Sequence, residues 1–438
     1  MSDFDMEEEK IPYDTEPIER HRNSDYNRYI KELKKQEKKQ SGGNKANWVT
    51  YLIVSLTVVV CVLGVSIFNI GRKLADLTNS GQDYTMNISA TGGNQAYAAA
   101  KGMMSTVCVS AANTNSGTDA NAFFSSAMSS RGSGVIIELD KAAGDAIIVT
   151  NYHVVSNTST NKVYAYRWVL LWDSIVPIQA TYIGGTSKYD IAVLKIENSD
   201  EIKKSSCAAA TIASSNNVHI GEYVCAIGNS RARNLRITTG VVAVEEDLMG
   251  NGTYNMYLSH SADVNSGNSG GGLYNASGDL IGIVNAKFRD VNETTGELMY
   301  YEVIHGMNYA IPVDIAINIA KNIVRNNSNP LKPSLGLTLG DSYSYTGKNF
   351  NITEDGLGYT TYNIVITKSV GKFWVNDELV SITYNYGGKD ITTKLNRLFA
   401  LDSVLFNLDK NSSATVVVKR GNGETSFKIT VDSVSVVS

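Results

Sequence analysis

One serine of the chain lies in a loop crowded with glycine. From Ser261 to Leu273 the sequence reads Ser-Ala-Asp-Val-Asn-Ser-Gly-Asn-Ser-Gly-Gly-Gly-Leu, with Ser269 between Gly267 and a run of three further glycines. Glycine permits backbone conformations that other residues resist, so such a loop can expose a hydroxyl nucleophile and turn N–H groups toward an incoming carbonyl. Taken alone, the same glycines are equally consistent with a tight turn.

A histidine and an aspartate upstream supply the partners that a serine nucleophile needs. His153 follows the apolar run 146–150, and Asp190 directly precedes the apolar run 191–196. A serine hydroxyl is a weak nucleophile at neutral pH, so it requires an imidazole to accept its proton and a carboxylate to orient that imidazole. The order His, Asp, Ser and the strand-like flanks predict a triad of His153, Asp190 and Ser269 held by β-sheet.

These residues lie within a longer resemblance. From near Ala98 onward, over most of its length, the chain is similar to the trypsin-like serine proteases of the HtrA/Deg type. Several matched blocks in the right order are far more specific than the serine loop alone. The blocks that carry the likeness are residues 132–137, 150–155, 190–196, 221–224, 226–229, 240–242, 267–271 and 309–312.

The resemblance implies a role for each candidate site residue. It assigns Ser269 as the nucleophile, His153 as general base and then acid, and Asp190 as the group that orients His153. It assigns the backbone N–H groups of Gly267 and Ser269 to an oxyanion hole, with Asn268 as a further candidate.

Two positions depart from the family pattern. Ser266 stands where proline is usual before the nucleophile, and Gly272 stands where proline or alanine often follows the paired glycines. Both changes give the backbone more freedom. Because the family's oxyanion loop can switch between competent and collapsed forms, the resemblance leaves the resting activity of this chain open.

Two residues of the same loop bear on the primary substrate pocket. The resemblance assigns Val264 to the pocket wall, which implies small or medium aliphatic side chains before the cleaved bond. Asp263 lies where trypsin itself carries its Lys/Arg-selecting carboxylate, so an acidic pocket is the alternative.

An uncharged run near the start predicts one transmembrane helix at 47–70. It has the roughly 20 apolar residues that a helix needs to cross the hydrocarbon core. Lysines are concentrated in 31–45, before the run, and only Arg72 and Lys73 follow it closely. The positive-inside bias therefore predicts that the charged tail 1–46 is cytoplasmic and that the later domains are extracytoplasmic. A cleaved signal peptide is the alternative.

The segments on either side of this run are polar. The tail 1–46 has too few apolar residues for a core, and its lysines favour contact with anionic headgroups; a partner-binding tail is the alternative. Residues 71–97 contain a Gly-, Asn-, Ser- and Thr-rich stretch, which predicts a flexible linker.

Residues 98–326 alternate short β-type runs with Gly, Asn, Ser and Asp, a pattern typical of antiparallel barrels. We therefore expect a mainly β fold with a trypsin-like pair of six-stranded barrels. The first barrel would carry His153 and Asp190, the second Ser269, and the cleft between them the substrate. Residues 312–325 predict an amphipathic helix that closes this domain.

Residues 334–438, after a linker at 327–333, resemble a small α+β PDZ-like domain. Such a domain binds the C-termini of extended peptides by adding them to a sheet edge, with loop N–H groups on the carboxylate. A purely structural packing role is the alternative. The residues that match the carboxylate-binding loop are Ser334, Leu335, Gly336 and Leu337.

Composition limits the classes of partner. The formal net charge is −4, and the globular part has no basic stripe with interleaved aromatic residues, which argues against nucleic-acid binding. The cysteine spacing matches no zinc pattern, and the predicted chemistry requires no metal or organic cofactor. Cys207 and Cys225 could pair in an exported chain, although the low number of cysteines favours buried thiols.

Together these features predict a membrane-anchored, bacterial serine endopeptidase. It would degrade misfolded or unfolded exported proteins through an acyl-enzyme. The resemblance implies a homotrimer that is controlled by binding of peptides or misfolded proteins. The alternative is a catalytically quiet, chaperone-like scaffold that captures peptides on the same fold.

Overall fold

The structure is a computed structural model that describes residues 27–35, 93–249, 255–291, 298–337, 341–354, 356–431 and 433–437. Residues 27–35 are helical and belong to a unit, 1–85, that is separate from the compact unit 86–438. The predicted membrane span at 47–70 lies outside the described residues. Among the residues that are described, no helix combines the length and apolar character that a bilayer crossing needs.

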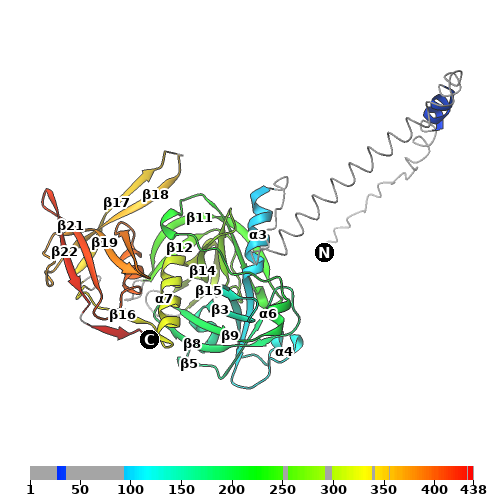
Figure 1. Ribbon diagram of the computed structural model, residues 1–438, viewed down its shortest axis with the longest axis horizontal. Helices are drawn as coiled ribbons and strands as arrows, with labels where there is room; N and C mark the ends of the chain where they lie inside the picture. The colour runs from blue at the N-terminus through cyan, green and yellow to red at the C-terminus, as the bar shows by residue number, and fades with distance from the viewer. Residues whose placement is uncertain are drawn as a thin grey trace, which may run out of the picture. The chain divides into compact units, whose positions relative to one another are not determined.

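The first sheet of the compact unit is formed within residues 106–196. The stretch 178–186 supplies both end strands, β7 and β8, which are separated only by Ala180. Figure 1 labels β8 beside β9, its partner in the sheet. The N–H of Ala180 donates to the carbonyl of Arg167 in β6 (2.9 Å). One bent stretch thus passes from one edge of the sheet to the other. The strands, in sheet order, are β7 (Ile178–Gln179), β6 (Tyr166–Leu170), β1 (Thr106–Ala112), β2 (Ser130–Asp140), β3 (Asp145–Thr150), β9 (Ile191–Ile196) and β8 (Thr181–Thr186).

The prediction of six strands for this sheet is wrong in number, because the bend at Ala180 divides one strand into β7 and β8. The sheet is nevertheless barrel-like, since its two edges belong to one continuous stretch. Its interior is apolar, as the alternation of β9 illustrates: Ala192, Leu194 and Ile196 face this interior, whereas Ile191 and Val193 face a second core.

The second sheet is a closed six-stranded barrel, as predicted from the sequence. Its interior is filled by buried aliphatic side chains such as Val224, Leu258, Leu273 and Val284. Ser269 lies in the connection between two of its strands, so the two sheets carry the triad candidates in the predicted division. The strands, in barrel order, are β10 (Tyr223–Gly228), β11 (Arg236–Met249), β12 (Asn255–His260), β15 (Leu298–Pro312), β14 (Leu280–Val291) and β13 (Gly272–Asn275).

Short elements connect these strands. Helix α3 begins within the predicted linker 71–97, so the last residues of that linker are helical. Cys108, Cys207 and Cys225 are free and buried, which agrees with the prediction of buried thiols. The connecting elements are α3 (Gly93–Ser105), α4 (Ala120–Phe124), α5 (Tyr152–Val155), α6 (Asp200–Lys204), the 3₁₀ turns η1 (Ser215–Asn217) and η2 (Ser230–Ala232), and the ribbon β4 (Ser156–Asn157) with β5 (Lys162–Val163).

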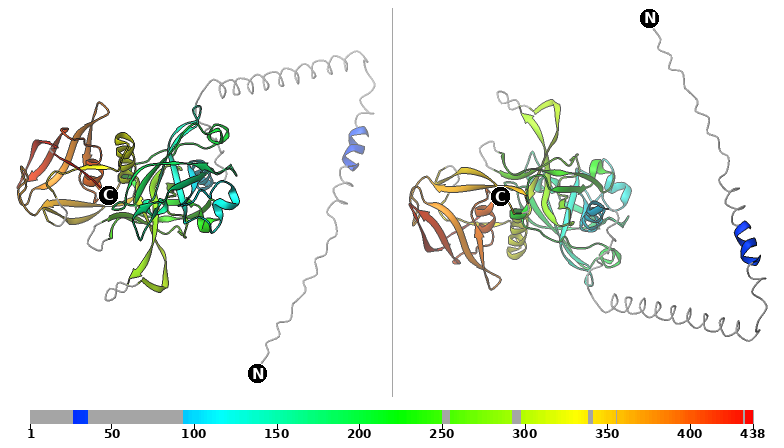
Figure 2. Two further views of the ribbon diagram at one scale, coloured as in Figure 1. Left: turned by 90° about the horizontal axis from the view of Figure 1, so that it is seen from below. Right: turned by 90° about the horizontal axis from the view of Figure 1, so that it is seen from above.

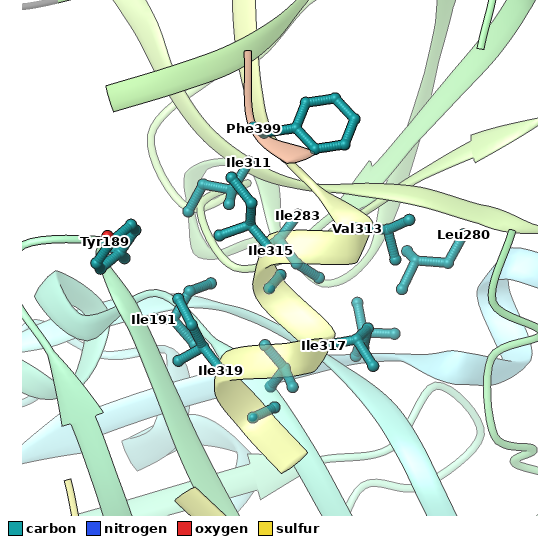
Figure 3. Packing of buried hydrophobic residues seen from close by; sticks show 14 of the residues in the cluster. Tyr189, Ile191, Leu280, Ile283, Ile311, Val313, Ile315, Ile317, Ile319 and Phe399 are labelled. Atoms are coloured by element: carbon teal, nitrogen blue, oxygen red, sulfur yellow. The ribbon is translucent and has the colours of Figure 1, made fainter. Parts of the chain in front are cut away.

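Helix α7 (Val313–Asn326) is the amphipathic helix predicted at 312–325. Ile315 and Ile319, one turn apart, are buried on the face that meets the strands, at 2% and 0% exposure. The helix ends where Asn327 adopts a left-handed φ of 48° and its N–H closes the last turn. Residues from both sheets and from the C-terminal segment surround this face; those labelled in Figure 3 include Tyr189, Ile191, Leu280, Ile283 and Phe399.

The C-terminal residues form a small α+β domain with its own apolar core. Figure 2 shows its strands, coloured orange to red, as a sheet distinct from the green strands of the preceding barrel. Three residues of the predicted linker 327–333 form a strand, β16 (Leu331–Pro333), which pairs with β23 (Val434–Val436). The other elements are β17 (Tyr343–Ile352), β18 (Gly358–Ile366), β19 (Glu378–Tyr386), β20 (Lys389–Lys394), α8 (Ala400–Leu405), β21 (Ser413–Arg420) and β22 (Gly423–Thr430).

The C-terminal domain is packed onto the rest of the compact unit. Phe399 and Phe406, which flank α8, belong to the same apolar core as α7. Polar contacts support this packing: the side chain of Asn322 on α7 donates to the carbonyl of Phe406 (2.8 Å), and Glu245 on β11 accepts the N–H of Thr360 (2.7 Å). The domain is therefore joined to the barrels by buried contacts as well as by the covalent chain.

Replacing Ile319 tests the importance of the α7 core. Ile319→Ala removes a fully buried side chain, and we expect it to destabilise the fold by about 2–5 kcal/mol. Ile175→Ala is the matched control, because Ile175 is 80% exposed and should change stability little. Thermal unfolding followed by circular dichroism measures both, and equal midpoints for the two variants would contradict the assignment.

Candidate active site

Strands β3 and β9 bring His153 and Asp190 together. They pair antiparallel with Thr150 opposite Ala192, so the residues just beyond these ends lie close to one another. The Nδ1 atom of His153 is 2.7 Å from Oδ2 of Asp190, and the backbone N–H of His153 donates to Oδ1 (2.9 Å). The carboxylate therefore holds both the ring and the backbone of the histidine.

Asp190 is also held through its own backbone. Its φ of 52° is left-handed, a conformation that aspartate tolerates better than most residues with a Cβ. The side chain of Asn151 donates to its carbonyl oxygen (2.9 Å). The flanking Tyr189 and Ile191 are buried in the core beside α7, as Figure 3 shows, whereas the carboxylate of Asp190 faces His153.

Asp190 determines the protonation of His153. Burial alone would lower the pKa of His153, because the imidazolium loses solvent. The hydrogen bond and the negative charge of Asp190 outweigh burial, so the pKa of His153 lies above its ordinary value of about 6.5. In the neutral ring the Nδ1 proton is donated to Asp190, which leaves Nε2 as the basic atom.

Glycine shapes the loop that carries Ser269. Gly267 and Gly270 have φ values of 98° and 83°, in the region that residues with a side chain rarely adopt. A Cβ at position 267 would also collide with the carbonyl oxygen of Asn229, and one at position 270 with that of Ser133. The glycines therefore allow the loop to pack closely against the neighbouring strands. A simple tight turn would not require such close packing.

Ser133 in β2 ties this loop to the first sheet. Its N–H donates to the carbonyl of Ser269 (2.8 Å), and its hydroxyl donates to the carbonyl of Gly267 (2.7 Å). The same hydroxyl accepts the N–H of Asn229 (2.7 Å). Ser133 is fully buried, where an unmade hydrogen bond costs about 1–3 kcal/mol. The loop of the second barrel is thus fastened to a strand of the first.

Two of the three predicted oxyanion donors have unengaged N–H groups. Within the described residues, the backbone N–H groups of Gly267 and Ser269 have no acceptor. The N–H of Asn268 donates instead to the carbonyl of Asn265 (3.0 Å). The geometry therefore leaves Gly267 and Ser269 as candidate donors and engages Asn268 in the turn.

A contact from η2 orients the peptide before Gly267. The N–H of Arg231 donates to the carbonyl of Ser266 (2.7 Å). Because the C=O and N–H of one trans peptide point in opposite directions, this contact turns the N–H of Gly267 away from Arg231. Ser266, one of the two positions that differ from the family pattern, is therefore held through its backbone carbonyl.

Asn285 in β14 connects Ser269 to Asp190. The hydroxyl of Ser269 donates to the carbonyl of Asn285 (2.8 Å), and Nδ2 of Asn285 donates to Oδ2 of Asp190 (2.8 Å). In the described part of the chain no hydrogen bond joins Ser269 to His153. The three triad candidates thus belong to one hydrogen-bonded cluster, but the proton of Ser269 is directed at β14.

Three residues of this cluster were not predicted as site residues. Ser133 and Asn151 lie in blocks that carry the resemblance, so a signal for them existed. Asn285 lies in none of these blocks, and nothing in the sequence distinguishes it from the chain's many other asparagines. Its part in the site follows from the pairing of β14 within the barrel.

The two predicted pocket residues have different surroundings. Val264 is 3% exposed and lies among the apolar side chains of the second barrel. Asp263 is solvent-exposed, and its carbonyl accepts the hydroxyl of Thr238 (2.6 Å). Val264 is thus part of the barrel core, and the side chain of Asp263 is not buried.

The predicted carboxylate-binding loop, 334–337, lies in the C-terminal domain after β16. The N–H of Ser334 donates to the carbonyl of Ser433 (3.2 Å), and the N–H of Gly336 donates to the hydroxyl of Ser334 (3.1 Å). The side chains of Leu335 and Leu337 pack against the C-terminal core. Among the described residues, the N–H groups of these two leucines have no acceptor.

Other histidines form no metal site in the part of the chain that is described, where no three His, Cys, Asp or Glu side chains cluster. His260 is fully buried, and burial lowers its pKa to about 4, so its ring is neutral. Nδ1 of His219 lies 3.2 Å from Glu222.

Comparison with known proteins finds similarity to peptidases. The family model of the trypsin-like peptidase domain matches residues 132–283. A probable periplasmic serine endoprotease DegP-like of Pseudomonas savastanoi pv. phaseolicola is 31% identical over 194 residues, 44% of this chain and 35% of the relative. The serine protease Do-like HtrA of Lactococcus lactis subsp. cremoris is 32% identical over 222 residues, 49% of each chain.

Among solved structures, that of the serine endoprotease from Yersinia pestis aligns with 78% of this chain and 98% of its own, at 20% identity and a TM-score of 0.42. The chain spans about half or less of the length of the curated relatives named above. Residues 132–283 are thus similar to trypsin-like peptidase domains, and about half of the chain is similar to serine endoproteases named DegP-like or HtrA.

The raised pKa of His153 predicts the acid limb of hydrolysis. Only neutral His153 can accept a proton, so activity should be lost as the pH falls through a value above about 6.5. The pH profile of kcat/KM for a peptide substrate measures this limb. Asp190→Asn should shift any residual limb to lower pH and reduce kcat by about 10³–10⁴-fold. An acid limb below 6 in the unaltered protein would contradict the prediction.

Proposed function

We propose that the chain is a serine endopeptidase that degrades misfolded or unfolded exported proteins. The observation that carries the proposal is the pair formed by His153 and Asp190, 2.7 Å apart and linked through Asn285 to Ser269. An alcohol, an imidazole and a carboxylate in one hydrogen-bonded cluster are the groups that acyl transfer requires.

The proposed reaction has two halves. Oγ of Ser269 attacks the substrate carbonyl carbon while Nε2 of His153 takes the hydroxyl proton, and Asp190 stabilises the imidazolium that forms. The tetrahedral adduct then expels the amine, which receives its proton from His153. In the second half a water, deprotonated by His153, attacks the acyl-enzyme and releases the acid, so that Ser269 recovers its proton.

The developing oxyanion would be bound by the backbone N–H groups of Gly267 and Ser269, which are not engaged by other described residues. Before attack, the hydroxyl of Ser269 must leave the carbonyl of Asn285 and turn toward His153. The resting form therefore holds the nucleophile in a local hydrogen bond, and substrate binding has to replace it.

The proposed setting is extracytoplasmic. The DegP-like relative carries "periplasmic" in its name, which supports action on exported proteins. The uncharged run 47–70 supports a single-pass anchor in the cell membrane with the amino terminus in the cytoplasm. A homotrimer is part of this proposal through the resemblance to HtrA/Deg proteases.

For the C-terminal domain we propose a PDZ-like role in binding peptide C-termini. The N–H groups of Leu335 and Leu337, which have no acceptor among the described residues, support it, because such a loop needs donors for a carboxylate. Helix α8 is buried against α7 in the described arrangement. A peptide that uses this helix would therefore have to compete with contacts already made by the protein.

One observation favours the second candidate, a catalytically quiet scaffold that captures peptides. The hydroxyl of Ser269 donates to a backbone carbonyl and not to His153. A protein that never released this bond would keep the fold without turnover. Activity measurements separate the two candidates directly.

Ser269→Ala decides between them. In the protease, this change removes the nucleophile, and casein hydrolysis should fall by about 10⁴-fold or more. Ser277→Ala is the matched control, since Ser277 is exposed on the same barrel and should leave turnover unchanged. Fluorophosphonate labelling should occur in the control and disappear in Ser269→Ala. Equal turnover by both variants would refute the protease proposal, and absence of turnover and labelling in the unaltered protein would support the scaffold.

A peptide panel tests the proposed pocket. The assignment of Val264 to the pocket wall predicts a preference for Val, Ala or Ile before the cleaved bond, because small apolar side chains gain about 1–3 kcal/mol from a matched apolar wall. Asp263→Asn should leave this preference intact. Strong selection of Lys or Arg that is lost in Asp263→Asn would show an acidic pocket instead.

A further inference from the structure

The side chain next to Asp190 belongs to a polar network with the C-terminal domain. The hydroxyl of Tyr189 donates to Oδ2 of Asp402 (2.7 Å). Nζ of Lys332 donates to Oδ1 of Asp402 (2.7 Å) and also to the hydroxyl of Tyr189 (2.7 Å). Each of the three side chains thus contacts the other two, and we call this set the Tyr189 network.

The network joins three separate parts of the fold. Tyr189 lies directly before Asp190 and β9, Lys332 lies in β16, and Asp402 lies in α8. The Lys332 and Asp402 side chains are only 17% and 16% exposed. The ring of Phe406 packs edge-on against Tyr189, with 5.2 Å between ring centroids. The network is therefore shielded from solvent, which strengthens its hydrogen bonds.

The charge states make the network stable near neutral pH. Burial alone would raise the pKa of Asp402, but the charge and hydrogen bond of Lys332, together with the Tyr189 hydroxyl, lower it. Burial, followed by the Asp402 charge, raises the pKa of Tyr189. The carboxylate is thus ionised and the phenol is neutral. The other titratable groups that face these residues are Lys188, Tyr343 and Tyr345.

The position of Tyr189 makes this network relevant to catalysis. Tyr189 belongs to the core beside α7 and bonds to Asp402 in α8, whereas the carboxylate of the next residue, Asp190, contacts His153. Asp190 has a left-handed φ of 52°, and its carbonyl accepts one hydrogen bond, from Asn151. A movement of Tyr189 would rotate the 189–190 peptide and displace the carboxylate from His153.

We infer that Tyr189, Asp402 and Lys332 are positioning residues that hold Asp190 against His153, so that docking of the C-terminal domain helps to assemble the active site. The inference rests on the proposed function, because it concerns the same triad. It goes further by naming the physical connection between the C-terminal domain and the catalytic carboxylate. The triad motifs do not predict this connection, because it depends on three residues that are distant in sequence.

The test compares two conservative variants in the full chain. Asp402→Asn removes the charge and keeps the shape, and Tyr189→Phe removes only the hydroxyl and keeps the packed ring. We expect each to lower kcat for a peptide substrate by about 10- to 100-fold, the effect of a small misplacement of a catalytic group, with KM changed less than about twofold. The double variant should be no worse than either single variant, because both act through one contact.

The pH profile separates positioning from general loosening of the fold. The pKa of His153 is raised by Asp190, so a displaced Asp190 should move the acid limb of kcat/KM to lower pH in both variants. Asp409→Asn is the matched control. It breaks another ion pair between α7 and the C-terminal domain, Arg325 with Asp409 (3.0 Å), which does not include Tyr189. It should leave kcat and the acid limb unchanged.

Three results would overturn the inference: unaltered kcat in Tyr189→Phe, an acid limb that does not move in either variant, or an equal loss in Asp409→Asn. Ser269→Ala, measured in the same assay, tests the proposed function separately. If Ser269→Ala retains full turnover, the protease proposal fails. If turnover depends on Ser269 but Tyr189→Phe behaves as the unaltered protein, only the positioning role fails.

Discussion

The rest of the site depends on the hydrogen bonds that the carboxylate of Asp190 accepts. This carboxylate accepts them from the ring and backbone of His153 on the first sheet and from Asn285 on the second barrel. A carboxylate is costly to remove from water unless its lone pairs are satisfied, and these donors satisfy it. The hydrogen bond and the charge of Asp190 outweigh burial and raise the pKa of His153. The carboxylate of Asp190 therefore both links the two sheets and contributes to the chemistry of the site.

The loop that carries Ser269 is likewise held by contacts from both sheets. Ser133 of the first sheet holds the loop at Gly267 and Ser269, and Arg231 holds the peptide at Ser266. These contacts compensate for the backbone freedom that Gly272 and the lack of a proline at position 266 would otherwise confer. The loop conformation is consequently a property of both sheets, and its two unengaged N–H groups depend on strands that are distant in sequence.

Helix α7 and the residues around it extend this coupling to the C-terminal domain. The core beside α7 includes Tyr189 and Ile191, which flank Asp190, and also Phe399 and Phe406, which flank α8. Burial of these side chains orders the segment that carries Asp190, because residues joined by a rigid, planar peptide bond cannot move independently. The C-terminal domain thus contributes to the same core that supports the site.

Motif order and the resemblance to HtrA/Deg proteases predicted the pairing of His153 with Asp190. Periodicity predicted the mainly β class, the antiparallel barrels and helix α7. These features depend on local patterns, because alternation and helical spacing select the buried face whatever the partner. The tertiary structure alone decided the bend at Ala180, the strand β16 in a predicted linker, the engagement of Asn268 in a turn, and the roles of Asn285 and Tyr189. Each of these depends on which distant backbone group or side chain lies within hydrogen-bonding range, and that is set by strand pairing and domain packing, not by neighbours in the sequence.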